Sequence, residues 1–153
     1  MSVAFWARWL AAALLSALPL RAEPFLEITV EGRVLRTLPL PQGQELCLSW
    51  AHSVTGGEVA DCFENRAGQF VLTRSFLHDF AAGLGEVTGR GRLAPAPGGG
   101  YWIDDINEPL PGNSLRLRIG AARVGHQLAT GDTVIPLSEL APEAQAILTL
   151  SAE

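Results

Sequence analysis

The most informative segment of the chain is LCLSWAHSVTGGEVADCF, residues Leu46–Phe63. Apolar and polar side chains alternate along both halves of this segment, and alternation with a period of two is typical of a half-buried β-strand. Between the halves, Gly56-Gly57 is typical of a two-residue hairpin turn, because primed turns require positive φ at central positions. The segment therefore predicts an antiparallel hairpin.

A turn centred on Gly56-Gly57 fixes which residues of the hairpin face each other. His52 then faces Asp61, on the same apolar face as Phe63. A histidine opposite a carboxylate can have a functional role, as an acid–base pair or as an oriented metal ligand. The alternative is a structural pair, in which Asp61 fixes the tautomer of the imidazole. The register predicts the pair and leaves both roles open.

The same register separates the two cysteines. Cys62 faces Ala51, so Cys47 lies about 13 Å away along the strand, whereas a disulfide requires Cα atoms within about 7 Å. The register therefore predicts unpaired thiols. A disulfide would instead fit a turn at Val54-Thr55, whose β-branched residues are unfavourable in a primed turn.

Short alternating segments, punctuated by glycine and proline, continue through the rest of the chain. The clearest of them is Leu115–Ile119, where leucine and isoleucine alternate with arginine. This pattern predicts an all-β fold: a single antiparallel β-sandwich or barrel-like domain. One short helix is expected near the C-terminus, at Ser138–Gln145, with Ser138 as its N-cap.

An apolar run from Trp9 to Leu20 follows Arg8. It is too short to cross a bilayer of about 30 Å as a helix, and its length is typical of a signal-peptide core. We therefore expect residues 1–22 to form a signal helix that is cleaved after Ala22, and residues 23–153 to form one exported domain. No cysteine lies near that cleavage site, so no lipid anchor is expected. The expected location is periplasmic or extracellular.

Composition and spacing narrow the possible chemistry. The net charge is −5 and no basic cluster is present, which argues against nucleic acid and anionic membrane surfaces as partners. His52, His78 and His126 lack the spacing of metal ligands, so neither a metal nor a cofactor is expected. Ser53 follows His52 directly, and consecutive strand side chains point to opposite faces, so this histidine is poorly placed to activate this serine.

The segment His78–Gly85 contains two closely spaced glycines. Gly83 and Gly85 predict a backbone that bends sharply or approaches a neighbour closely. Three aromatic residues, Phe80, Tyr101 and Trp102, are candidates to line a pocket beside it. The alternative is that these aromatic rings belong to the core, as they commonly do in a small β domain.

Several of these segments together resemble a bacterial family, domain of unknown function 1850 (DUF1850). They are Trp50–Val54, Asp61, Phe80–Leu84 and the glycine-rich approach to Trp102, within a resemblance that covers residues 25–150. Asp61 stands where the family usually has glutamate. The resemblance implies a small exported protein encoded beside TRAP-type transporters, in particular those with the TAXI class of solute receptor, and it carries no established activity.

We therefore expect a non-enzymatic accessory or binding domain whose partner is the TRAP-type permease or the TAXI receptor. Its expected binding surface consists of the motif positions His52, Ser53, Asp61, Ala82, Gly83, Leu84 and Trp102. The alternative is an extracytoplasmic metal-binding protein or hydrolase that uses His52 and Asp61. A third reading is a free-standing envelope domain with a structural role.

Overall fold

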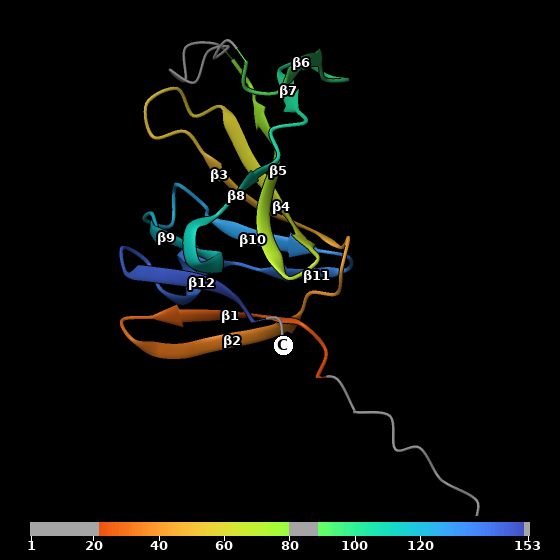
Figure 1. Ribbon diagram of the computed structural model, residues 1–153. Coiled ribbons are helices and arrows are strands. Elements are labelled where there is room, and N and C mark those ends of the chain that lie inside the picture. The colour runs from red at the N-terminus through yellow and green to blue at the C-terminus, as the bar shows by residue number, and fades with distance from the viewer. Residues whose placement is uncertain (1–21, 80–88, 152–153) are drawn as a thin grey trace, which may run out of the picture.

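Alternating apolar residues form the strands of this fold, and turns rich in glycine and proline separate them. The structure is a computed structural model that describes residues 22–79 and 89–151 (Figure 1). Its strands form two antiparallel sheets, so the prediction of an antiparallel all-β fold is confirmed. Within the described residues the sheets do not close into a barrel.

The smaller sheet has four strands in the order β2-β1-β12-β9. In that order, their bounds are Arg33–Pro39, Phe25–Val30, Gln145–Ser151 and Ser114–Arg118. The larger sheet has the order β11-β10-β3-β4-β5-β7-β6, and β8 also pairs with β5. Its strands are β3 (Glu45–Ala51), β4 (Glu58–Arg66), β5 (Gln69–Leu77), β6 (Arg92–Pro95), β7 (Tyr101–Asp104), β8 (Glu108–Pro109), β10 (Gln127–Thr130) and β11 (Thr133–Ile135).

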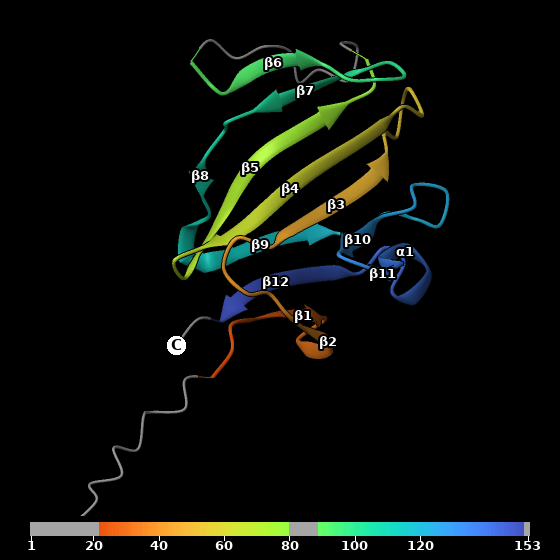
Figure 2. The ribbon, with the colours of Figure 1, turned by 90° about the vertical axis from the view of Figure 1, so that its right-hand side faces the viewer.

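The two sheets share one apolar core. Leu26 on β1 and Leu148 on β12 are fully buried in the same cluster as Leu46 on β3. In the same cluster, the rings of Phe63 and Phe70 lie with their centroids 5.0 Å apart. Figures 1 and 2 show that the β6–β7 hairpin lies at the end of the larger sheet away from β1 and β2. The candidate site is found at that end.

The hairpin of β3 and β4 has a different register from the predicted one. Asp61 lies opposite Leu48, and Val59 lies opposite Trp50. The predicted contact between His52 and Asp61 is therefore wrong. The pairing is shifted by an even number of residues, which leaves every side chain on its predicted face because side chains alternate with a period of two. Phe63 accordingly faces the core as expected.

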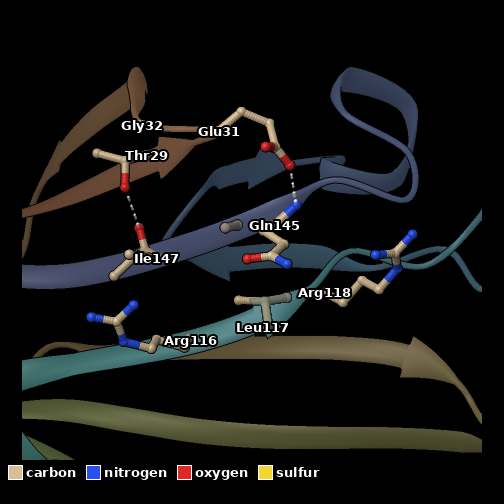
Figure 3. A pocket seen from close by; sticks show the side chains of 9 residues that line it. Thr29, Glu31, Gly32, Arg116, Leu117, Arg118, Gln145 and Ile147 are labelled. Atoms are coloured by element: carbon tan, nitrogen blue, oxygen red, sulfur yellow. Dashed lines mark hydrogen bonds between the residues drawn. The ribbon is translucent and has the colours of Figure 1, made fainter.

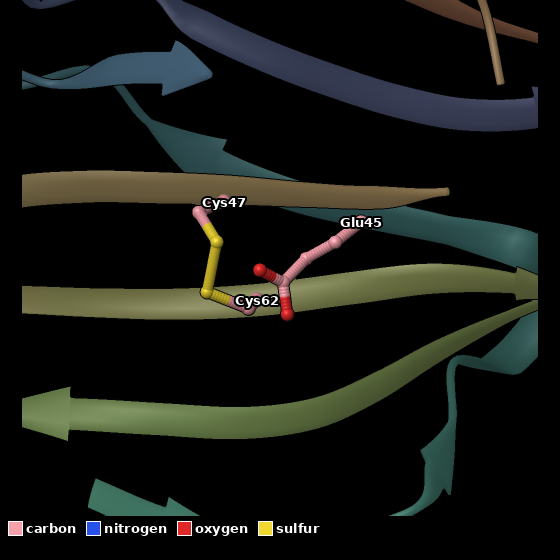
Figure 4. Close-up of side chains that lie close together, drawn as sticks. All are labelled: Glu45, Cys47 and Cys62. Carbon is pink, nitrogen blue, oxygen red and sulfur yellow. A yellow bond between two sulfur atoms is a disulfide. The ribbon is translucent and has the colours of Figure 1, made fainter. Parts of the chain in front are cut away.

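The new register also reverses the prediction for the cysteines. Cys47 lies directly opposite Cys62, and the two form a disulfide (Figure 4). The prediction of unpaired thiols is wrong because it depended on a tight turn at Gly56-Gly57. The connection is instead a longer loop, His52–Gly57, in which Gly56 has a positive φ.

The short helix near the C-terminus is present as α1 (Leu137–Leu140), one turn long and shorter than the predicted Ser138–Gln145. Ser138 is not its N-cap, because the cap position is Pro136 and no side chain caps the helix. The Ser138 hydroxyl instead donates to the Gly120 carbonyl at 2.9 Å. A 3₁₀ turn, η2 (Pro111–Asn113), precedes β9.

The expected signal helix lies outside the described residues and stays a prediction. Within residues 22–79 and 89–151, the structure contains no helix that is both long enough and apolar enough to span a membrane.

Candidate functional site

His52 organises the loop that joins β3 to β4. Its Nδ1 atom accepts hydrogen bonds from the backbone N–H groups of Val54 and Thr55, each at 3.3 Å. Its own N–H donates to the Gly57 carbonyl and its carbonyl accepts from the Gly56 N–H, both at 2.8 Å. An acceptor side chain that binds amides two and three residues ahead stabilises a turn, as aspartate and asparagine often do. The imidazole therefore serves the shape of this loop.

We predict that His52→Ala destabilises the domain by about 1 kcal/mol, since two amides lose their acceptor. In hydrogen exchange, the amides of Val54 and Thr55 should exchange faster in this variant than in the wild type. His52→Asn is the matched control, because an amide oxygen can accept in the same turn and should restore most of the protection. Unchanged exchange in His52→Ala would contradict this role.

The His52–Gly57 loop packs against the end of β5. The His78 N–H donates to the Glu58 carbonyl at 2.9 Å. A Cβ atom added to Gly57 would lie 3.0 Å from Oδ2 of Asp79 and 3.1 Å from Cβ of His78. Asp79 directly precedes Phe80–Leu84, the second segment that resembles the family. The structure therefore places the start of that segment beside the His52–Gly57 loop, which follows the first such segment, Trp50–Val54. The predicted site residues Ala82, Gly83 and Leu84, and Phe80 with them, lie outside the described residues.

A pocket of about 300 Å³ opens beside this junction, and we call it the loop-edge pocket. Its lining residues are His78, Asp79, Leu93, Pro95, Gly100 and Tyr101. Leu93 and Pro95 come from β6, so the wall of the pocket is the β6–β7 hairpin. The pocket combines apolar side chains with an imidazole and a carboxylate at one end, which is a typical composition for a ligand site.

Gly100 lets the hairpin approach β5 closely. Its φ is +76°, in the left-handed region that favours glycine. A Cβ atom there would lie 2.7 Å from the Leu77 carbonyl oxygen and 2.8 Å from the Phe76 ring. The glycine therefore fixes the distance between β5 and the wall of the pocket.

Of the two predicted pocket aromatics that the structure describes, Tyr101 lines this pocket and Trp102 does not. Its side chain is almost fully buried. Burial raises the pKa of the Tyr101 phenol above its ordinary value, and the negative charge of Asp79 raises it further. The Tyr101 side chain therefore contributes an uncharged phenol to the lining of the pocket.

Asp61 lies on the inward face of the larger sheet, between Leu48 and Ser75. The Ser75 hydroxyl donates to Oδ1 of Asp61 at 2.6 Å. Burial raises the pKa of the Asp61 carboxyl above its ordinary value, and this effect outweighs the hydrogen bond from Ser75 and the positive charge of Arg90, which both lower it. Asp61 is therefore a half-buried acid that accepts a hydrogen bond from a serine, and the residues opposite it in the sheet are Leu48 and Ser75.

We predict that Asp61→Asn stabilises the domain at pH 7. The folded protein holds the Asp61 proton more tightly than the unfolded chain does, because the pKa of this carboxyl is raised on folding. The protonated group therefore contributes its full stability below the unfolded pKa of 3.8. This stability is lost as pH rises through the raised folded pKa. Asparagine keeps an acceptor for Ser75 and carries no charge. The melting temperature of the variant should therefore exceed that of the wild type at pH 7, and the gap should shrink toward pH 4. A gap that is independent of pH would contradict this assignment.

Trp102 lies on the outward face of the larger sheet, since its neighbour Ile103 is in the core. The Arg74 guanidinium lies 4.2 Å from the centroid of the Trp102 ring and forms a bidentate ion pair with Glu45, at 2.9 and 2.7 Å. Phe76 packs against the same ring, with centroids 5.2 Å apart. Trp102 and Asp61 therefore face opposite sides of one sheet, and the predicted binding residues do not form one surface.

A possible metal cluster of Glu45, Cys47 and Cys62 lies on this outward face, with one ligand atom of each within 4.8 Å of the others (Figure 4). The two sulfur atoms are bonded to each other, so they are not thiolate donors. The Glu45 carboxylate pairs with Arg74. The cluster does not fit a metal ion while the disulfide is intact.

His126 has a role that the sequence did not indicate. Its ring stacks on Trp50 with centroids 5.5 Å apart, and its Nδ1 accepts from the Gly120 N–H at 2.9 Å. Burial lowers the pKa of the His126 imidazole. Ser138 accepts from the His126 backbone N–H at 2.8 Å, so the hydroxyl contacts the main chain of this residue. The contacts of His126 with Trp50, Gly120 and Ser138 fix the loop between β9 and β10.

No curated protein and no solved structure matches this chain. The model of the family described as domain of unknown function (DUF1850) matches residues 46–137, which run from β3 to α1 and include the loop-edge pocket. This match covers more than half of the chain and agrees with the resemblance of the Trp50–Val54 segment. The chain belongs to the DUF1850 family.

Proposed function

We propose that this protein is an exported, non-enzymatic β-sandwich domain that serves a TRAP-type transport system of the TAXI class. Its recognition site is the loop-edge pocket together with the His52–Gly57 loop beside it. The observation that carries the proposal is the meeting of these two elements. The imidazole of His52 holds the His52–Gly57 loop in its turn, and this loop packs on His78 and Asp79. These two residues also line the pocket.

The Cys47–Cys62 disulfide supports the exported location. Disulfides form and persist in the periplasm and outside the cell, whereas cytosolic thiols are kept reduced. This bridge joins two central strands of the larger sheet. A periplasmic or extracellular location agrees with the leader that is expected at residues 1–22.

The contacts of the polar groups support binding rather than catalysis. The Nδ1 atom of His52 accepts from the loop amides, and that of His126 accepts from Gly120. Asp61 has Ser75 as its hydrogen-bond partner on the inward face of the sheet. These contacts give each group a structural role, and general acid–base catalysis requires a group placed to exchange a proton with a bound substrate.

The exposed apolar wall of the pocket supports an apolar side chain of a partner as its occupant. Leu93 is 40 % exposed on the wall of the pocket, which leaves apolar surface available to a partner. An apolar side chain of a receptor or permease loop would cover this wall, with a donor group directed to the Asp79 carboxylate. The TRAP-type permease or the TAXI receptor is the partner that the family resemblance implies.

Co-purification from cells that express the transporter tests the proposal. Tagged full-length protein should retain the permease or the receptor, and Leu93→Asp should reduce the amount retained by at least about tenfold, as expected when a charge enters an apolar contact. Val134→Asp is the matched control, because Val134 is also an exposed apolar residue on an edge strand, 57 % exposed on β11. Failure of the wild type to retain either protein, together with unchanged solute uptake in a deletion strain, would reject the proposal.

A further inference from the structure

A second candidate surface lies on the four-stranded sheet, at the other end of the molecule from the β6–β7 hairpin (Figures 1 and 2). It is a groove of about 450 Å³ on the outer face of β1, β12 and β9. Figure 3 shows Arg116 and Arg118 on β9 along one side of the groove. Thr29 of β1 and Glu31 of the turn that follows β1 lie along the other side.

Strand β12 forms the floor of the groove. In the ladder between β12 and β9, Ile147 lies opposite Arg116, and Gln145 lies opposite Arg118. Paired residues of an antiparallel ladder point to the same face, so both arginines share the outer face with the floor residues. The groove therefore places two guanidinium groups beside a partly apolar strip.

The charge of these arginines is not balanced within the described part of the chain. Four other arginines there form ion pairs with acidic residues: Arg66, Arg74, Arg90 and Arg92. Arg116 and Arg118 are exposed and, like Arg33, Arg36 and Arg123, form no ion pair in the same residues, and they are the two arginines that line the groove. Glu31 lines the groove, but its Oε1 accepts from the Gln145 N–H at 2.8 Å. The groove thus offers positive charge to a ligand from outside.

The spacing of the two arginines indicates the form of that ligand. Alternate residues of a strand lie about 7 Å apart. An extended peptide has the same repeat, so acidic side chains at alternate positions match two arginines at alternate positions. We propose that this groove binds an extended acidic segment of a partner protein, with two carboxylates paired to Arg116 and Arg118 and the intervening side chains against Ile147 and Thr29.

Fluorescence anisotropy at low ionic strength tests this second surface independently of the transporter. The probe is a fluorescein-labelled peptide of alternating glutamate and threonine, added to the full-length protein. Arg116→Gln/Arg118→Gln should weaken its binding about tenfold, the combined effect expected of two exposed ion pairs. Arg33→Gln/Arg36→Gln removes the same charge from β2 of the same sheet and should change binding by less than about twofold.

Three results would overturn the proposal. One is equal weakening by the two double variants, which would show a general effect of net charge. Another is equally tight binding of a peptide in which the same glutamates form one block, because the alternate spacing would then be irrelevant. The third is displacement of the labelled peptide by inorganic phosphate at equal concentration, which would indicate a small-anion site instead.

Discussion

Cys47→Ala/Cys62→Ala is expected to lower the free energy of unfolding by about 3 kcal/mol. The two cysteines are 15 residues apart in the sequence, and a bridge over a loop of this length restricts the unfolded chain substantially. The bridge also fixes the register of β3 against β4, since the two residues are directly opposed. For a domain of this size, the loss corresponds to a fall of roughly 10 °C in melting temperature.

Thermal unfolding with and without a reducing agent measures this effect. The reduced wild type should melt close to the double variant, and the double variant should not respond to the reductant. A wild type whose melting temperature is the same with and without reductant, after complete reduction has been verified by thiol labelling, would contradict the role of the bridge.

Phe63→Ala is expected to destabilise the domain by about 3–5 kcal/mol. Phe63 is 2 % exposed and packs against Phe70 in the core that the two sheets share. Removing the ring leaves a cavity between the sheets, and a close-packed interior relaxes only partly to fill it. The large effect therefore follows from both the lost apolar burial and the cavity.

Urea unfolding measures this prediction. Val54→Ala is the control within the same hairpin, because Val54 is 86 % exposed and its truncation should change stability by less than about 0.5 kcal/mol. Phe63→Leu should lie between the two. A loss below about 1 kcal/mol for Phe63→Ala would place this ring outside the core.

The faces of the strands could be predicted from the sequence because alternation is a local signal. Leu46, Phe63 and Leu117 pack in or against the core, as the pattern indicates. The register of the hairpin could not be predicted in the same way. Gly56-Gly57 indicates a tight turn, whereas the loop is held open to His52–Gly57 by hydrogen bonds to an imidazole. A histidine acting as a turn acceptor has no distinctive sequence pattern.

The candidate site could be predicted only in part. Tyr101 lines the pocket and the His52–Gly57 loop lies beside it, because both belong to strand ends at the same end of the larger sheet. The prediction that Trp102 belongs to the same surface is wrong, because alternation along β7 places it on the opposite face from Tyr101. Asp79 and Leu93 could not be found from the sequence, since the pairing of β5, β7 and β6 brings them together across distant segments.

Photo-crosslinking in cells tests most directly the claim that the loop-edge pocket is the recognition site. The photoreactive amino acid p-benzoylphenylalanine replaces Leu93 in one full-length variant and Val134 in another. Both positions are exposed, and only Leu93 lines the pocket. The account predicts a crosslink from position 93 to the TRAP-type permease or the TAXI receptor, and none from position 134. Equal crosslinking from both positions, or none from position 93, would contradict it.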